Sequence, residues 1–247
     1  INISKIYLDS KNFVNNFSGN IIYKKNKIYK SDLVSTFPNN KKLNLTINTN
    51  ENNEKITTIY SENPKPLLSS YKFIKGFEEG ILDFYSVKRN NVSESVLKIS
   101  DFKIQEVPVL AKLLTLASLQ GIADLLTGEG IRFDDFELKF TSKDKLMRID
   151  ELYAIGPAIS IMMEGYIEKN NLISLKGTLV PATTINRTIA SIPLLGNILV
   201  GKKVGEGVFG VSFKIKGPKD KLKTTVNPIK TLTPRFITRT LEKLKKN

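Results

Sequence analysis

The sequence predicts a mainly β protein: a curved antiparallel meander sheet with an apolar inner face, plus two or three short amphipathic or apolar helices near the C-terminal half. Two observations lead to this fold class. Apolar residues recur at every second position in many stretches, as in strands with one buried and one solvated face. Short loops rich in Lys, Asp and Asn separate these stretches, as in hairpins.

Residues 1–95 are predicted to form an upstream β-repeat segment with Asn- and Lys-rich links. Its clearest strand is 43–47, where Leu and Ile alternate with Asn and Thr. A short helix is expected within 67–79, followed by a strand at 80–88. We assign residues 96–247 to a second region. Since no linker composition separates the two, we expect one elongated sheet to run through both.

The second region contains the strongest alternation. Its polar hairpin tips are expected at 142–145, 168–171 and 217–220, each between two apolar runs. The alternating apolar positions are predicted to point to the inner face of the sheet. They are Phe136, Leu138, Phe140, Ile159, Ile161, Met163, Ile173, Leu175, Leu179, Phe209, Val211 and Phe213.

Residues 108–127 interrupt the strand pattern, with Pro at the start and Gly128 after the end, as in a helix. Such a helix would be about 30 Å long, but its polar residues Lys112, Gln120 and Asp124 argue against a transmembrane span. Two interpretations stay open. The helix caps the apolar face of the sheet, or its wide leucine surface lies at a membrane interface.

Two later segments also depart from alternation. Residues 183–200 predict a short helix, a kink at Pro193 and an apolar turn around Gly196. Residues 234–246 have helical spacing and a basic last turn. That pattern suits either a helix on the sheet or one that lies on anionic lipid.

Residues that carry common enzyme chemistry are missing from the sequence. It contains no cysteine and no histidine, which removes thiolate nucleophiles and Ser-His or Cys-His pairs. The carboxylates show no spacing typical of a metal site or a glycosidase. The sequence therefore predicts a protein that is not an enzyme and that has no cofactor and no metal site.

The chain is strongly basic, with 38 Lys and Arg against 24 Asp and Glu, a net charge of +14 at pH 7. The excess is mostly lysine spread along the chain, without an aromatic RNA-binding motif, a basic heptad helix or a zinc finger. We therefore predict no nucleic-acid partner. Diffuse lysines suit attraction to anionic lipid head groups.

A G-x-G-x-x-G pattern at Gly205, Gly207 and Gly210 resembles a nucleotide-binding loop. A kinase would need its catalytic and metal-binding motifs downstream, and a dinucleotide site would need a helix after the loop. Here an alternating strand follows, without D-F-G or His-Arg-Asp. The glycines are better explained as a tight turn before a strand.

Four stretches carry a resemblance to a known family. They are "LLTLASLQGIADLLTGEGIRFDDFELKF" (113–140), "IGPAISIMMEGYI" (155–167), "KGTLVPATTINRTIASIPLLGNILVGKKVGEGVFGVSFKIKGP" (176–218) and "VNPI" (226–229). In this order they resemble the C-terminal region of the AsmA-like, YhdP-type bacterial envelope proteins. The resemblance covers about residues 96–236.

The resemblance implies a periplasmic bridge protein, anchored in the inner membrane by a segment outside this chain. It implies a curved sheet with an apolar groove that binds and conducts phospholipid toward the outer membrane, without catalytic residues. The implied partners are phospholipid, a membrane surface and other envelope proteins. The alternative function is an envelope scaffold or an assembly factor for outer-membrane proteins.

The inner-face positions given above would then contact lipid, although packing under the 108–127 segment is an equally open interpretation for each. Two apolar elements could meet a bilayer, the 108–127 segment and the turn after Pro193. We predict membrane contact by Leu113, Leu116 and Leu195.

Overall fold

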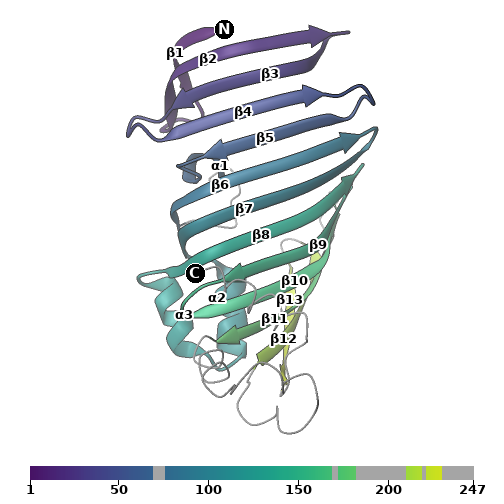
Figure 1. Ribbon diagram of the computed structural model, residues 1–247. Coiled ribbons are helices and arrows are strands. Elements are labelled where there is room, and N and C mark those ends of the chain that lie inside the picture. Colours follow the sequence, from purple (N-terminus) through teal and green to yellow (C-terminus); the bar gives the residue numbers. More distant parts are fainter. Residues whose placement is uncertain (69–75, 169–171, 182–209, 219–220, 230–247) are drawn as a thin grey trace, which may run out of the picture.

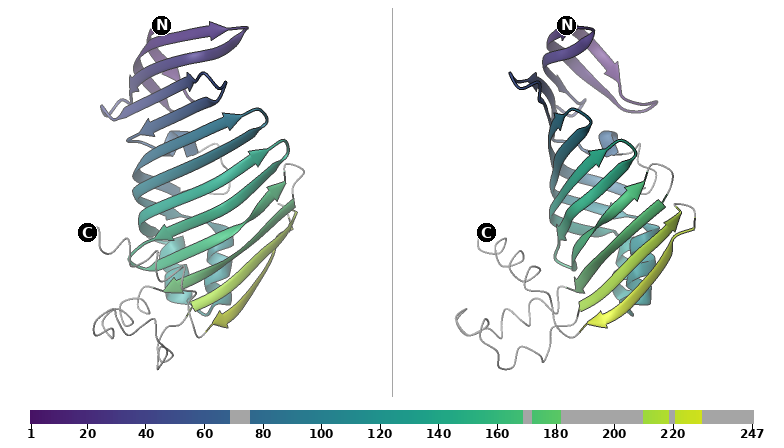
Figure 2. Two further views of the ribbon diagram at one scale, coloured as in Figure 1. Left: turned by 45° about the vertical axis from the view of Figure 1, so that its right-hand side comes forward. Right: turned by 90° about the vertical axis from the view of Figure 1, so that its right-hand side faces the viewer.

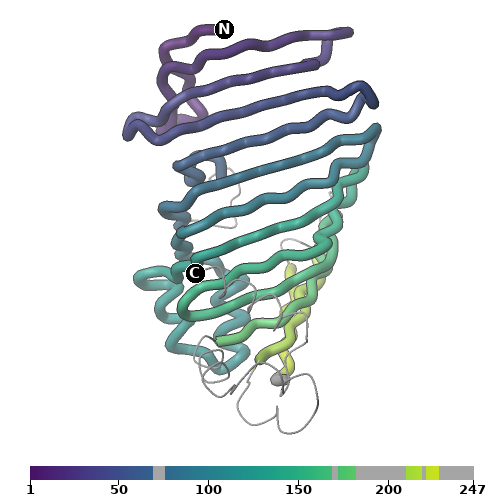
Figure 3. The backbone as a smooth tube through the Cα atoms, in the orientation of Figure 1, coloured from purple at the N-terminus to yellow at the C-terminus, as the bar shows by residue number. Residues whose placement is uncertain are grey.

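The computed structural model describes residues 1–68, 76–168, 172–181, 210–218 and 221–229. These residues form one open sheet of 13 strands that follow one another in chain order. Every strand is antiparallel to its neighbours, so the backbone meanders from one end of the molecule to the other (Figures 1 and 3). The predicted fold class is confirmed.

The sheet runs without interruption through residue 95, because β7 spans that position. Most strands are 7–14 residues long. The strands are β1 (Asn2–Tyr7), β2 (Phe13–Lys24), β3 (Lys27–Thr36), β4 (Lys42–Thr49), β5 (Lys55–Ser61), β6 (Gly76–Arg89), β7 (Val92–Gln105), β8 (Ile131–Lys143), β9 (Leu146–Ile155), β10 (Ile159–Glu168), β11 (Leu172–Pro181), β12 (Gly210–Pro218) and β13 (Lys223–Ile229). The helices are α1 (Lys65–Leu68), α2 (Pro108–Leu116) and α3 (Gln120–Thr127).

The C-terminal half of the sheet bends around the helix pair α2–α3. The pair is inserted between β7 and β8, and α3 contacts both of these strands. Helix α2 reaches β13, five strands beyond β8 in the sheet. One small helical unit can contact both regions only because the sheet curves, as the rotated views show (Figure 2). We call the face toward α2 and α3 the inner face and the opposite one the outer face.

The main core lies between the helix pair and the adjacent ends of the strands. Helices α2 and α3 contribute Leu110, Leu113, Leu114, Ala123 and Leu126, all buried. The sheet contributes Phe77, Leu82, Ile99, Phe102, Ile104, Ile131, Phe133, Ala154, Ile159, Leu179, Phe213 and Ile215. The helices therefore cover part of the inner face, as one of the two interpretations of residues 108–127 expected.

The predicted single helix over 108–127 is wrong in one respect, because it is broken at 117–119. Ser118 adopts a left-handed φ of 58°. The N–H of Leu119 donates to the Leu114 oxygen (2.8 Å), and the N–H of Ser118 donates to the Thr115 oxygen (3.0 Å). These bonds form a Schellman ending with serine at the position usually held by glycine. Gly121, the one glycine of this segment, lies inside α3 and not at the break.

The predicted hairpins are confirmed by the pairing of β8 with β9, β10 with β11 and β12 with β13. The strand after the glycine-rich loop is also confirmed, since β12 begins at Gly210. The short helix expected within 67–79 begins earlier, at Lys65. The segments 183–200 and 234–246 lie outside the described residues.

Phe213 packs across a glycine, and this contact generates a stability prediction. Gly177 pairs with Met163 on one side and Phe213 on the other. A Cβ at residue 177 would lie 2.3 Å from the Met162 oxygen and 2.6 Å from the Phe213 ring. We expect Gly177→Ala to lower the free energy of unfolding by about 1–3 kcal/mol through overpacking, measured by urea denaturation. Unchanged stability would contradict this close packing.

Candidate functional site

The inner face carries an uninterrupted row of apolar residues across the sheet. Directly paired residues of neighbouring antiparallel strands point to the same face. Following the pairs from β3 to β13 gives one row with glycine as its only position without an apolar side chain. The row is Leu33, Leu45, Ile59, Phe84, Leu97, Leu138, Leu152, Met163, Gly177, Phe213 and Val226.

All predicted inner-face residues that the structure describes lie on this face. Ile159, Leu179, Val211 and Phe213 are buried. The others are only partly buried, and so retain surface that the protein does not cover: Phe136, Leu138, Phe140, Ile161, Met163, Ile173 and Leu175. Phe209 lies outside the described residues.

Strand β9 also lines the inner face, although its alternation is irregular. Ile149 pairs with Phe140 and Leu152 with Leu138, so both point inward although they are three positions apart in the sequence. The extra residue is a β-bulge at Asp150, which both neighbouring ladders record as a shift of register. A search for period two therefore missed β9. The only signal in the sequence was the three-residue spacing itself.

A cluster of phenylalanines extends the apolar surface toward the helices. The ring of Phe102 stacks on Phe77 and Phe133 at centroid distances of 5.3 and 5.5 Å, and meets Phe136 edge-on at 6.2 Å. Asp101 has a left-handed φ of 53°, which breaks the alternation between Ile99 and Phe102. Both residues therefore join the same core.

At the strand ends far from the helices, the inner face is apolar on β8 to β11 and polar on β5 to β7. On β8 to β11, apolar side chains continue to the hairpin tips, as at Phe140, Met147, Ile167 and Ile173. On β5 to β7 the corresponding positions are polar. They are Lys55, Lys88 and Ser93 in the last row, and Thr57, Ser86 and Ser95 in the row before it.

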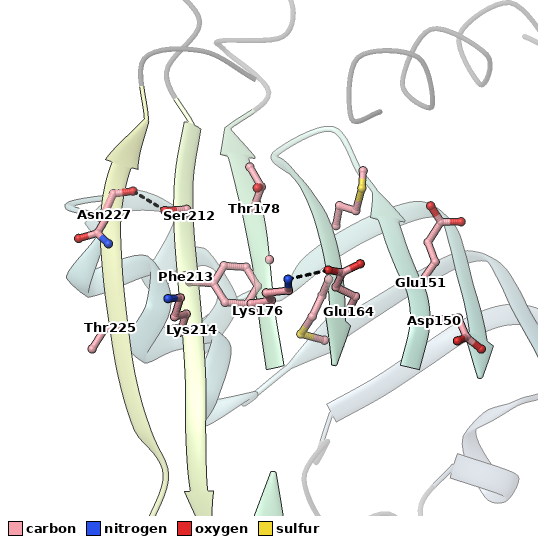
Figure 4. Close-up of a pocket in the computed structure, with 13 residues that line it drawn as sticks. Asp150, Glu151, Glu164, Lys176, Thr178, Ser212, Phe213, Lys214, Thr225 and Asn227 are labelled. Atoms are coloured by element: carbon pink, nitrogen blue, oxygen red, sulfur yellow. Dashed lines mark hydrogen bonds and ion pairs between the residues drawn. The ribbon is translucent and has the colours of Figure 1, made fainter. Parts of the chain in front are cut away.

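The outer face of β8 to β11 carries charged side chains that form ion pairs. Lys139 lies 2.9 Å from Glu137 and 3.7 Å from Glu151, and Lys176 lies 3.0 Å from Glu164. A pocket of about 390 Å³ lies here (Figure 4). It is lined mainly by outer-face residues: Glu151, Met162, Glu164, Lys176, Thr178, Ser212, Lys214, Thr225 and Asn227.

The described residues contain no group of three or more His, Cys, Asp or Glu placed to hold a metal ion. The pKa of Asp134 is raised by its partial burial and by the nearby carboxylates of Asp101 and Asp135. Its side chain is nevertheless exposed, and Asp134 is not among the residues that line the pocket described above. Within the same described ranges, each helix is too short or too polar to cross a membrane.

The predicted membrane contacts fall in different environments. Leu113 lies in the core with 4% of its surface exposed, whereas Leu116 on the same helix is 45% exposed. Leu125 on α3, which the sequence analysis did not single out, is also 45% exposed. Leu195 lies outside the described residues.

Comparison with known proteins gives no relative: no family model, curated protein or solved structure matches the chain.

Two substitutions distinguish the covered part of the inner face from the open part. Phe213→Asp places a carboxylate in the core and should lower the free energy of unfolding by about 3–5 kcal/mol. Leu175→Asp should cost less than half as much, because Leu175 is only partly buried and its carboxylate can reach water. Chemical denaturation of both variants measures the difference, and equal losses would mean that this part of the face is a closed core.

Proposed function

We propose that the inner face binds the acyl chains of phospholipid, as one segment of a bridge that moves phospholipid between the inner and outer membranes of a bacterial envelope. The observation that carries the proposal is the apolar row from Leu33 to Val226, in which only Leu33 and Phe213 are buried and the other members are partly exposed. A single-layer sheet with an open apolar face needs an apolar occupant.

The dimensions of the row favour lipid chains. At about 4.8 Å per strand, its course from β3 to β13 is about 48 Å, longer than the roughly 30 Å hydrocarbon core of a bilayer. Each CH₂ group moved from water onto such a surface contributes about 0.8 kcal/mol. Two long acyl chains would thus contribute more than about 10 kcal/mol before the costs of binding.

The resemblance of residues 96–236 to the AsmA-like proteins supplies the rest of the proposal. In this setting the chain lies in the periplasm, held at the inner membrane by a segment outside this chain. Lipid would bind without catalysis or a cofactor, and the membrane surface and other envelope proteins would be its further partners.

The second candidate function is a scaffold that helps outer-membrane proteins to assemble. Strand β1 favours it, because its Ile1-to-Tyr7 segment exposes apolar side chains at an edge of the sheet: Ile3 is 41% and Tyr7 64% exposed. An edge strand of this kind can pair with a strand of another chain. This function needs no lipid on the inner face.

Lipid analysis separates the two functions. We expect mass spectrometry of the natively extracted protein to find bound phospholipid, and Leu175→Asp to reduce it severalfold because a charge on the open inner face repels acyl chains. Ser174→Asp is the matched control, since residue 174 pairs with Tyr166 and Lys216 on the outer face. A folded protein that carries no phospholipid would favour the scaffold.

Membrane contact is expected to depend on the exposed leucines of the helix pair. In vesicle flotation, Leu116→Asp should reduce binding because it removes an apolar residue from the surface, and high salt should reduce binding only partly. Leu146→Asp is the control, because Leu146 is 43% exposed but lies at the β8–β9 tip. If Leu116→Asp leaves binding unchanged and high salt abolishes it, binding rests only on the attraction of lysines to anionic lipid.

A further inference from the structure

Lysines face one another three times along the hairpin-tip edge of the sheet, the edge opposite the helices. The directly paired residues are Lys24 with Lys27, Lys55 with Lys88, and Lys216 with Lys223. Like charges in directly opposite cross-strand positions destabilise a sheet. Among the residues that the structure describes, none of these six lysines has a carboxylate partner within ion-pair distance.

At the edge of the sheet next to the helices, a similar pair of cations has acidic residues beside it. Lys103 and Arg132 are also directly opposite each other, but Arg132 forms an ion pair with Glu79 at 2.9 Å, and Glu78 pairs with Lys103 across the ladder. Arg132 is therefore compensated by an ion pair, and Lys103 has an acidic residue directly opposite it. At the hairpin-tip edge that compensation is missing from the described residues.

The pair Lys55 and Lys88 differs from the other two in its surroundings. Both residues lie on the inner-face side, at the rim of the apolar row. Glu54, which precedes Lys55, and Glu94, which follows the cross-strand partner of Lys88, both form ion pairs with Arg89. Hydrogen bonding to Arg89 and Asn50 lowers the pKa of Glu54, so this carboxylate stays ionised and engaged away from the lysines.

The inner surface of β5 and β6 changes in two steps from the rim inward. After Lys55 and Lys88 come the hydroxyls of Thr57 and Ser86, which are paired with each other, and then Ile59 and Phe84. Each step is two residues, or about 6.6 Å along a strand. Ser95 on β7 adds a third hydroxyl, which donates to the Ser86 oxygen at 2.9 Å.

This order of cation, hydroxyl and apolar surface matches the order of phosphate, glycerol ester and acyl chain in a phospholipid. We propose that Lys55 and Lys88 bind the phosphate of a phospholipid whose acyl chains lie on the inner face. The bound phosphate offsets the repulsion between the two lysines, and Thr57, which is only partly buried, faces the ester groups. The site rests on the proposed function and adds a defined head-group position to it.

The test compares two probes with the same acyl chains. Delipidated protein is titrated with dihexanoyl phosphatidylglycerol and with dihexanoylglycerol, which lacks the phosphate. We expect the phospholipid to bind about tenfold or more tightly, as charge-assisted hydrogen bonds allow. The double variant K55Q/K88Q should lose this preference and keep its affinity for dihexanoylglycerol. It should fold at least as well as the parent, because it removes a repulsion.

The control K216Q/K223Q removes the same charge from the same edge, at a pair on the outer face, and should keep the preference. A preference that survives in K55Q/K88Q, or that both variants lose equally, would overturn the site. So would inorganic phosphate that competes at equal concentration, since it would indicate a site for free anions. Equal binding of both probes to the parent overturns only this site, whereas binding of neither overturns the proposed function as well.

Discussion

The structure depends on one constraint, which is that among the described residues a single-layer sheet has two faces and the helix pair α2–α3 packs on one of them. A sheet normally buries its apolar face against a second layer. Here α2 and α3 bury the part of the inner face nearest to them, around Phe133, Leu179 and Phe213. The curvature of the sheet follows from this packing, because β8 and β13 must both reach the same helix pair.

The part of the inner face that α2 and α3 do not cover makes the sheet amphipathic. Apolar side chains reach the hairpin tips on β8 to β11, whereas β5 to β7 end in hydroxyls and lysines. On β8 to β11 the outer face carries ion pairs such as that of Lys176 with Glu164. The described part of the chain therefore presents partly exposed apolar side chains on the inner face and ion pairs on the outer face of β8 to β11.

Much of this arrangement could be predicted from the sequence, because the side-chain period of a strand is local. Alternation placed Phe136, Ile161 and Leu175 on one face, and the polar tips placed the hairpins. The sequence did not predict features that depend on a single backbone angle or on the register of a partner strand. The left-handed φ of Ser118 ends α2, and the bulge at Asp150 breaks the alternation of β9. The opposition of Lys55 and Lys88 depends on register, which no local pattern reveals.

The central claim is that lipid lies on the inner face and not on the outer one. Neighbouring residues on β8 test it directly, since Leu138 points inward and Lys139 pairs with Glu151 on the outer face. A photo-crosslinking side chain is placed at each position in turn, and crosslinks to radiolabelled phospholipid are measured in cells. The account predicts labelling at residue 138 and little at residue 139. Equal labelling at both positions, or labelling only at residue 139, would contradict it.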